Sequence, residues 1–228
     1  MKKFEIFVLV IMLVIMSNTI AVSAAENNDT VVATEKLNEE AGEKLIKEQM
    51  DGWEKLNEDY KSGKLVIQAD KTNDSDGDFS TKAIGTYPTR SGVILVTDSA
   101  LGSFGSIVGH AGIIYSDYLT VESFGDTGVN YYDNNWDTRY SDANVYGVSA
   151  KDTTFAEDHT AAVWAYNKWG CPYNIDFFNI DIRTKFYCSQ LVYAAFIDNF
   201  NINLNQGGGI VTPLDLVQTS NTFTLYQN

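Results

Sequence analysis

Strand-like and helix-like segments are separated along the chain, and this order limits the possible folds more than any other feature. Four segments rich in β-branched and aromatic residues come first, bounded by turn residues, at 92–98, 110–115, 119–123 and 144–149. Helical patterns follow them, and a last strand-like segment, FTLYQ, closes the chain. Strands followed by helices are typical of the α+β class. We therefore predict a small, mainly antiparallel sheet flanked by helices.

Three helices are predicted after these strands. Thr154 and Glu157 form a capping box that opens a helix running to about Trp169. A second helix begins near Cys188, and Thr212-Pro213 starts a short third one. These helices supply the apolar faces that the sheet needs for a core.

The first 24 residues have the features of a secretory signal peptide. Two lysines precede an apolar run, and Val22 and Ala24 stand at the −3 and −1 positions of a cleavage site. The run is shorter than the roughly 20 residues that a spanning helix needs. We therefore expect residues 1–24 to be removed and the protein to be secreted, extracellular or associated with the cell wall, without stable membrane insertion.

The acidic composition limits the range of partners. The formal net charge is −14. Loss of two lysines and one glutamate with residues 1–24 changes it to about −15. Binding to nucleic acid or to anionic membranes needs clustered lysine and arginine. We therefore expect no nucleic acid as a partner.

Two further segments, 25–63 and 64–87, precede a domain at 88–228. The first has apolar residues at helical spacing from about Thr34 to Ser62, which predict one long amphipathic helix. This helix either packs on the back of the domain, which is the interpretation we favour, or covers a cleft as a prodomain. The second segment is predicted to be a polar linker.

The linker contains the acidic string DSDGD, which is similar to part of a calcium-binding loop. Aligning Gly77 with the glycine of such a loop puts Thr72 at the first ligand position and Ala83 at the last, where an acidic residue is required. We therefore expect a solvated linker there and no metal site.

The two cysteines, Cys171 and Cys188, pose a choice between a disulfide and a reactive thiol. In a secreted protein an even number of cysteines suggests a disulfide, and composition alone favours that pairing. Cys188, however, begins the predicted helix in FYCSQLVYAAF, where unpaired N–H groups and the helix dipole favour a thiolate. Its backbone N–H could also donate to an oxyanion. The alternative is a small buried residue at a helix start.

A nucleophilic cysteine needs a base, and the chain has only two histidines. His110 lies in VGHAGIIY at the mouth of a strand, between Gly109 and Gly112, which leave room for a substrate. His159 lies in the capped helix on a face shared with apolar residues, where an imidazole more often packs than reacts. We therefore predict that His110 is the general base.

Glu122 is the candidate for orienting the His110 imidazole. It lies on the return strand of the hairpin, on the less apolar face. An odd-numbered loop such as 115–117 would pair Ile114 with Tyr118 and put Glu122 opposite His110. A two-residue loop would turn Glu122 to the other face, so the pattern leaves an orienting and a solvated carboxylate both open.

The order of these motifs resembles a known family. A strand with GHAGII, a return strand with VES, a helix ending in KWGCPYN and the helix of FYCSQLVYAAF are similar, in that order, to NlpC-like peptidases of the papain-like superfamily. The similarity is greatest to the circularly permuted YiiX/YaeF-like branch, in which the histidine precedes the cysteine. The resemblance covers about residues 88–228, includes the VTPLDL segment, and implies a permuted papain-like fold.

The resemblance implies further roles. In that family a tyrosine of a PY motif reaches the oxyanion site, and Tyr173 matches it. Cys188 matches the nucleophile, whereas Cys171 falls at a variable position, which implies an incidental thiol or a regulatory disulfide. Two residues depart from the family's pattern, because Val93 and Gln190 stand where acidic residues are usual. These departures leave the substrate preference open.

Together these residues predict a cysteine peptidase or amidase that needs no cofactor and no metal. The Cys188 thiolate would attack an amide carbonyl, and His110, held by Glu122, would shuttle the proton. The Cys188 N–H and Tyr173 would stabilise the oxyanion. Secretion and the resemblance imply peptide substrates such as peptidoglycan fragments. The alternatives are an amidase or acyltransferase acting on lipid-like acyl chains, and a non-catalytic binding module.

Overall fold

The structure is a computed structural model that describes residues 28–71, 85–99 and 107–228. The predicted signal peptide at 1–24 and the DSDGD string lie outside the described residues. Among the residues described, no helix is long and apolar enough to cross a bilayer.

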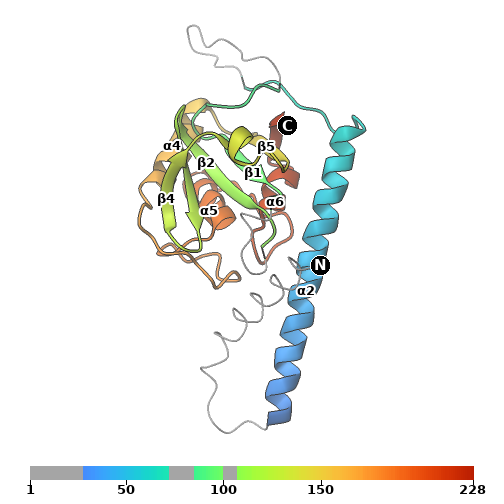
Figure 1. The fold of residues 1–228 in the computed structure, drawn as a ribbon. Helices are drawn as coiled ribbons and strands as arrows, with labels where there is room; N and C mark the ends of the chain where they lie inside the picture. The colour runs from blue at the N-terminus through green and yellow to red at the C-terminus, as the bar shows by residue number, and fades with distance from the viewer. Residues whose placement is uncertain (1–27, 72–84, 100–106) are drawn as a thin grey trace.

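A six-stranded antiparallel sheet forms the centre of the domain, with strand order β4-β3-β2-β1-β5-β6 (Figure 1). This arrangement confirms the predicted α+β class and the antiparallel pairing. The strands are β1 (Ile94–Thr97), β2 (His110–Ser116), β3 (Leu119–Phe124), β4 (Gly128–Asp133), β5 (Val145–Ala150) and β6 (Thr222–Gln227).

Helices cover both faces of this sheet. On one face α4 and α5 pack against β2 and β3, and α6 packs against β1 and β6. On the other face the short helix α3 brings Trp136 against a smaller apolar cluster that includes Leu95 and Ile114. The helices described are α2 (Asn28–Lys61), α3 (Trp136–Arg139), α4 (Phe155–Tyr166), α5 (Cys188–Phe200) and α6 (Pro213–Gln218).

Two of these elements, β4 and α3, were not predicted from the sequence. The β4 segment is polar at several positions and is defined by its pairing with β3, for which no local pattern is required. The α3 helix is only four residues long and lacks a side-chain cap. The helix α4 does begin with the predicted capping box of Thr154 and Glu157, but it ends at Tyr166, earlier than expected.

The β2–β3 hairpin reaches the predicted facing of Glu122 by a different route. Of the two loop lengths that the sequence left open, the turn has the two-residue one, because Ser116 pairs with Leu119. A β-bulge between Ile114 and Ser116 adds one residue to β2 and restores the parity that the short turn would have lost. Glu122 therefore pairs with Gly112 and lies on the same face as His110.

The C-terminal half of α2 lies along the domain beside α6 (Figure 1). Trp53 and Leu56 are buried in the main core, and the Trp53 ring stacks on Tyr146 at a centroid distance of 5.9 Å. Gln49 Oε1 accepts the backbone N–H of Val108 at 2.9 Å, and Trp53 Nε1 donates to the Val108 carbonyl at 3.4 Å. This half of α2 is therefore part of the core rather than a loosely attached cover.

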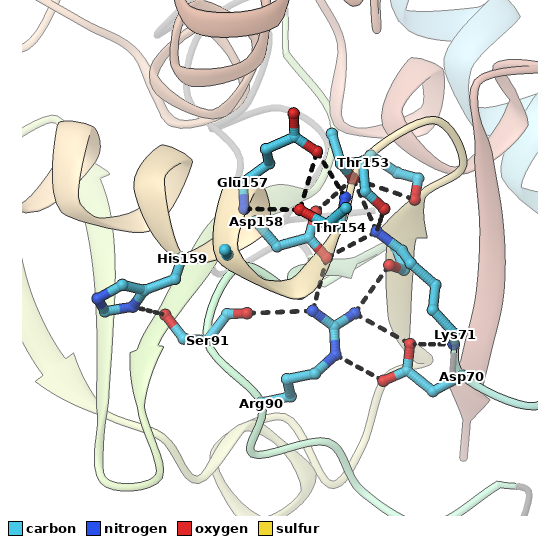
Figure 2. A network of polar contacts seen from close by, with 12 residues as sticks. Asp70, Lys71, Arg90, Ser91, Thr153, Thr154, Glu157, Asp158 and His159 are labelled. Carbon is cyan, nitrogen blue, oxygen red and sulfur yellow. Dashed lines mark hydrogen bonds and ion pairs between the residues drawn. The ribbon is translucent and has the colours of Figure 1, made fainter. Parts of the chain in front are cut away.

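A buried ionic network fixes the chain that follows α2 (Figure 2). The Asp158 carboxylate, fully buried at the start of α4, accepts hydrogen bonds from Lys71 at 2.8 Å and Arg90 at 2.6 Å. Arg90 also forms a two-pronged ion pair with Asp70. Gly92 has φ +82°, and a side chain there would meet the Asp158 carbonyl. Residues at the start of the expected linker thus make specific contacts with the domain.

We predict that Trp53→Ala lowers the free energy of unfolding by about 3–5 kcal/mol, because it opens a cavity in the core. The matched control on the same helix is Met50→Ala, since Met50 is 50% exposed and its loss should change stability by no more than about 0.5 kcal/mol. Urea unfolding followed by tryptophan fluorescence and circular dichroism measures both. Equal stability of the two variants would show that α2 is not part of the core.

Candidate active site

Cys188 is the first residue of α5, as its sequence context predicted. The preceding Tyr187 is buried and anchored at its hydroxyl, which donates to the Phe177 carbonyl and accepts the N–H of Val211. The Cys188 side chain is 1% exposed and lies at the helix end where unpaired N–H groups favour negative charge. This position enforces a water-poor environment in which a thiolate needs a specific counter-ion.

His110 supplies that counter-ion from the first residue of β2. Its imidazole is close enough to the Cys188 thiol for each group to shift the pKa of the other, and its Nε2 lies 2.9 Å from Glu122 Oε2. The ring is held between Phe124 and Trp136, with centroid distances of 4.1 Å and 5.4 Å. Because Nε2 is engaged by Glu122, Nδ1 is the ring nitrogen left to exchange a proton with the sulfur.

The Glu122 carboxylate is fully buried and satisfied on both oxygens. Oε2 faces His110, whereas Oε1 accepts from Thr120 Oγ1 at 2.5 Å, from Trp136 Nε1 at 2.9 Å and from Arg139 Nη2. Room for this arrangement comes from Gly112, where a Cβ would lie 2.7 Å from Glu122 Cγ. The carboxylate is therefore fixed in one orientation toward the imidazole.

The electrostatics of the three groups favour a charged resting state. Burial opposes ionisation of Cys188, but the hydrogen bond and positive charge of His110 outweigh it and lower the thiol pKa. Burial likewise opposes the charge on His110, but its hydrogen bonds to Cys188 and Glu122 raise its pKa to about 9. Burial raises the pKa of Glu122, and His110 with Arg139 more than reverse that effect. These shifts favour the thiolate, imidazolium and carboxylate forms of the three groups over their neutral forms.

Tyr173 lies in the segment that precedes α5 and senses the charge of Cys188. Burial, with the nearby Cys188 charge, raises its pKa well above the usual value, so the phenol keeps its proton and can donate. The segment is held by Gln190, whose Oε1 accepts from Asn174 at 3.0 Å and from the Tyr187 N–H at 3.2 Å. Gln190 thus joins the Tyr173 segment to the first turn of the nucleophile helix.

The remaining histidine and cysteine lie apart from these contacts. His159 Nδ1 is 2.9 Å from Ser91 Oγ, and its ring stacks on Tyr115 (Figure 2 shows the Ser91 contact). Cys171 is half-buried, and both cysteines are free thiols. In the described residues the site therefore contains one histidine, His110, and no disulfide.

Sequence reasoning missed three side chains of this site: Thr120, Trp136 and Arg139. Thr120 could have been found, because it alternates with Glu122 on the same strand face. Trp136 and Arg139 belong to the α3 helix, which was not predicted. They lie 14 and 17 residues after Glu122 in the sequence and contact it only because α3 packs against the hairpin. In the ranges that the structure describes, no three His, Cys, Asp or Glu side chains are grouped to hold a metal ion.

Comparisons with known proteins give two similarities. No family model matches the chain. The uncharacterized protein YycO of Bacillus subtilis (strain 168) is 29% identical over 155 residues, which are 65% of this chain and 60% of YycO. The chain thus matches less than two thirds of YycO's length. The crystal structure of metalloprotein YiiX from Escherichia coli O157:H7 is similar with a TM-score of 0.49 and 14% identity, covering 61% of this chain and 98% of YiiX.

We predict that iodoacetamide alkylates Cys188 rapidly already near pH 6, because His110 stays protonated up to about pH 9 and stabilises the thiolate below that pH. His110→Ala removes the counter-ion and should move the alkylation midpoint toward the ~8.5 of a free thiol. Peptide mass spectrometry separates Cys188 from Cys171. His159→Ala is the matched control and should leave the midpoint unchanged; the opposite pattern would assign the base to His159.

Proposed function

We propose that the protein is a cysteine hydrolase that cleaves amide bonds through a thioester intermediate. The observation that carries this proposal is the hydrogen bond between His110 Nε2 and the buried Glu122 carboxylate, beside a Cys188 at the start of α5 whose thiol pKa is lowered by His110. A binding module has no need of a buried ion pair at a helix start, and burying such charges is costly. Chemistry at the sulfur accounts for that cost.

The reaction follows from the charges of these groups. The Cys188 thiolate attacks the amide carbonyl, and the C=O electron pair moves to oxygen to give a tetrahedral oxyanion. The Cys188 backbone N–H and the Tyr173 hydroxyl are suited to donate to that oxygen. The oxyanion collapses, the C–N bond breaks, and His110 gives its proton to the leaving amine. Water, deprotonated by the now neutral His110, then hydrolyses the thioester and regenerates the thiolate.

The proposal includes the permuted papain-like architecture expected from the sequence. In support, the strand that begins with His110 packs beside the helix that begins with Cys188, and it comes earlier in the chain. The substrate class that follows is a peptide amide of the cell wall. This class also depends on secretion through the signal sequence at 1–24, which is part of the proposal.

A second candidate substrate is a lipid-like acyl amide or ester. The observation in its favour is the exposure of large apolar side chains in the segment that leads to the nucleophile. Phe178 is 75% exposed and Trp169 is 63% exposed, on either side of Tyr173. An acyl chain could cover such side chains, whereas a small polar peptide would not need them.

The test is product analysis after incubation of the protein, without residues 1–24, with peptidoglycan fragments and with acyl-lipid mixtures. Mass spectrometry identifies which of the two is cleaved. Cys188→Ala should lower turnover by at least about 10⁴-fold, because it removes the nucleophile. Cys171→Ala should keep most of it. Comparable loss in both folded variants, or turnover that survives in Cys188→Ala, would contradict the thiol mechanism.

The pH dependence of turnover gives an independent prediction. His110 has a pKa raised to about 9, so the proton needed by the leaving amine is present below that pH and is lost above it. Turnover should therefore fall through about pH 9 while Cys188 alkylation does not fall. A rate that keeps rising above pH 10 would show that His110 is not the proton donor.

A further inference from the structure

We propose that Arg139 is a positioning residue of the proposed reaction, which acts through Glu122 to hold His110 in its orientation and charge state. This inference rests on the proposed function, because it concerns the same cysteine–histidine pair. Among the described residues, Arg139 reaches the site through the Glu122 oxygen that faces away from His110.

The two oxygens of Glu122 are divided between two cations. Oε1 is saturated by Arg139, Trp136 and Thr120, whereas Oε2 is left for His110 at 2.9 Å. With three donors on one oxygen, rotation of the carboxylate would break several hydrogen bonds at once. The consequence is that the acceptor presented to the imidazole stays in one place.

An aromatic enclosure keeps the guanidinium of Arg139 at this carboxylate. Its Cζ lies 5.2 Å, 5.3 Å and 5.7 Å from the ring centroids of Tyr140, Trp136 and Tyr132. The side chain is only 26% exposed, so water screens its charge weakly. Cation–π contacts of this kind stabilise a charge in a fixed position, and a guanidinium keeps that charge at every pH of interest.

In the described part of the chain, the tyrosines around Glu122 do not change charge over the working pH range. Burial raises the pKa of each surrounding tyrosine above its usual value, so the phenols stay neutral. The titrating groups are then Glu122, His110 and Cys188, beside the permanent charge of Arg139. The ionisable side chains that interact with the carboxylate include His110 of β2, Tyr132 of β4, Arg139 of α3, and Tyr140 and Tyr87 from the segments beside α3, whereas Cys188 of α5 interacts with His110.

Loss of the Arg139 guanidinium should destabilise the Cys188 thiolate and His110 imidazolium at acidic pH. Without Arg139, the buried carboxylate keeps His110 as its single cationic neighbour, so it takes up a proton at higher pH. A protonated Glu122 no longer stabilises the imidazolium, and the thiolate then loses its counter-ion. The acid limb of Cys188 reactivity should therefore move to higher pH, which a purely structural role of Arg139 would not cause.

The experiment is the pH profile of Cys188 alkylation by iodoacetamide in the full chain. In Arg139→Gln the acid limb should move up by about one pH unit or more. Arg139→Lys keeps the positive charge but not the planar guanidinium group. The acid limb of its alkylation profile should lie between those of Arg139→Gln and the unchanged protein. The matched control is Arg183→Gln, because Arg183 forms a comparable partly exposed ion pair with Asp198 away from Glu122. That variant should keep the original limb.

A double variant separates action through Glu122 from direct action on the pair. In a Glu122→Gln background, Arg139→Gln should cause no further shift of the limb. A further shift there, or an unmoved limb in folded Arg139→Gln, would overturn the inference. Should Arg139→Gln not fold, Arg139→Lys against Arg183→Lys gives the same comparison, and an unmoved limb in Arg139→Lys would then overturn it.

Failure of the proposed function looks different in the same experiment. If Cys188 of the unchanged protein reacts no faster than Cys171 near pH 6, the thiolate itself is absent and the proposed function fails. If Cys188 is reactive but the acid limb of the Arg139 variants stays where it is in the Arg183 controls, the proposed function stands and the positioning role fails.

Discussion

The buried carboxylate of Glu122 is the constraint on which the β2–β3 hairpin, α3 and the candidate active site depend. A desolvated charge costs several kcal/mol unless it is paired and hydrogen-bonded. The fold meets that cost with donors from β2, β3 and α3, and α3 follows the β2–β3 hairpin only after the intervening strand β4. Gly112 must lack a side chain for the carboxylate to pass, and the bulge in β2 must set its facing. The same pairing of β2 with β3 therefore determines both the register of the sheet and the position of the Glu122 carboxylate.

The same carboxylate links the sheet to the nucleophile. Glu122 raises the pKa of His110, and the charge of His110 lowers the pKa of Cys188 against the effect of burial. The helix α5 contributes its N-terminal N–H groups, and Gln190 holds the preceding segment, with Tyr173, against the first turn of α5. We therefore expect a change at one end of this series to alter the reactivity of the sulfur at the other, including a change in α3, which contains none of the reacting groups.

The sequence allowed prediction of the elements whose signals are local. The capping box of Thr154 and Glu157, the helix start at Cys188 and the alternation in β3 each depend on residues a few positions apart. The bulge at Tyr115 could not be predicted, because it depends on how β2 pairs rather than on its composition. The contact of Arg139 with Glu122 could not be predicted either, because a four-residue helix has no periodic pattern in the sequence and its position depends on tertiary packing. The predicted facing of Glu122 toward His110 comes from a two-residue turn combined with a bulge, and not from the odd-numbered loop that was one of the two alternatives.

Titration of the His110 imidazole is the most direct test of this account. The chain has only two histidines, so ¹⁵N-histidine labelling gives two ring systems, which His110→Ala assigns. The account predicts that both ring nitrogens of His110 are protonated at pH 7 and that the ring titrates near pH 9, with its pKa lowered in Cys188→Ala. A neutral His110 ring at pH 7, titrating near the ~6.5 of an unperturbed histidine, would contradict the charged pair and the chemistry derived from it.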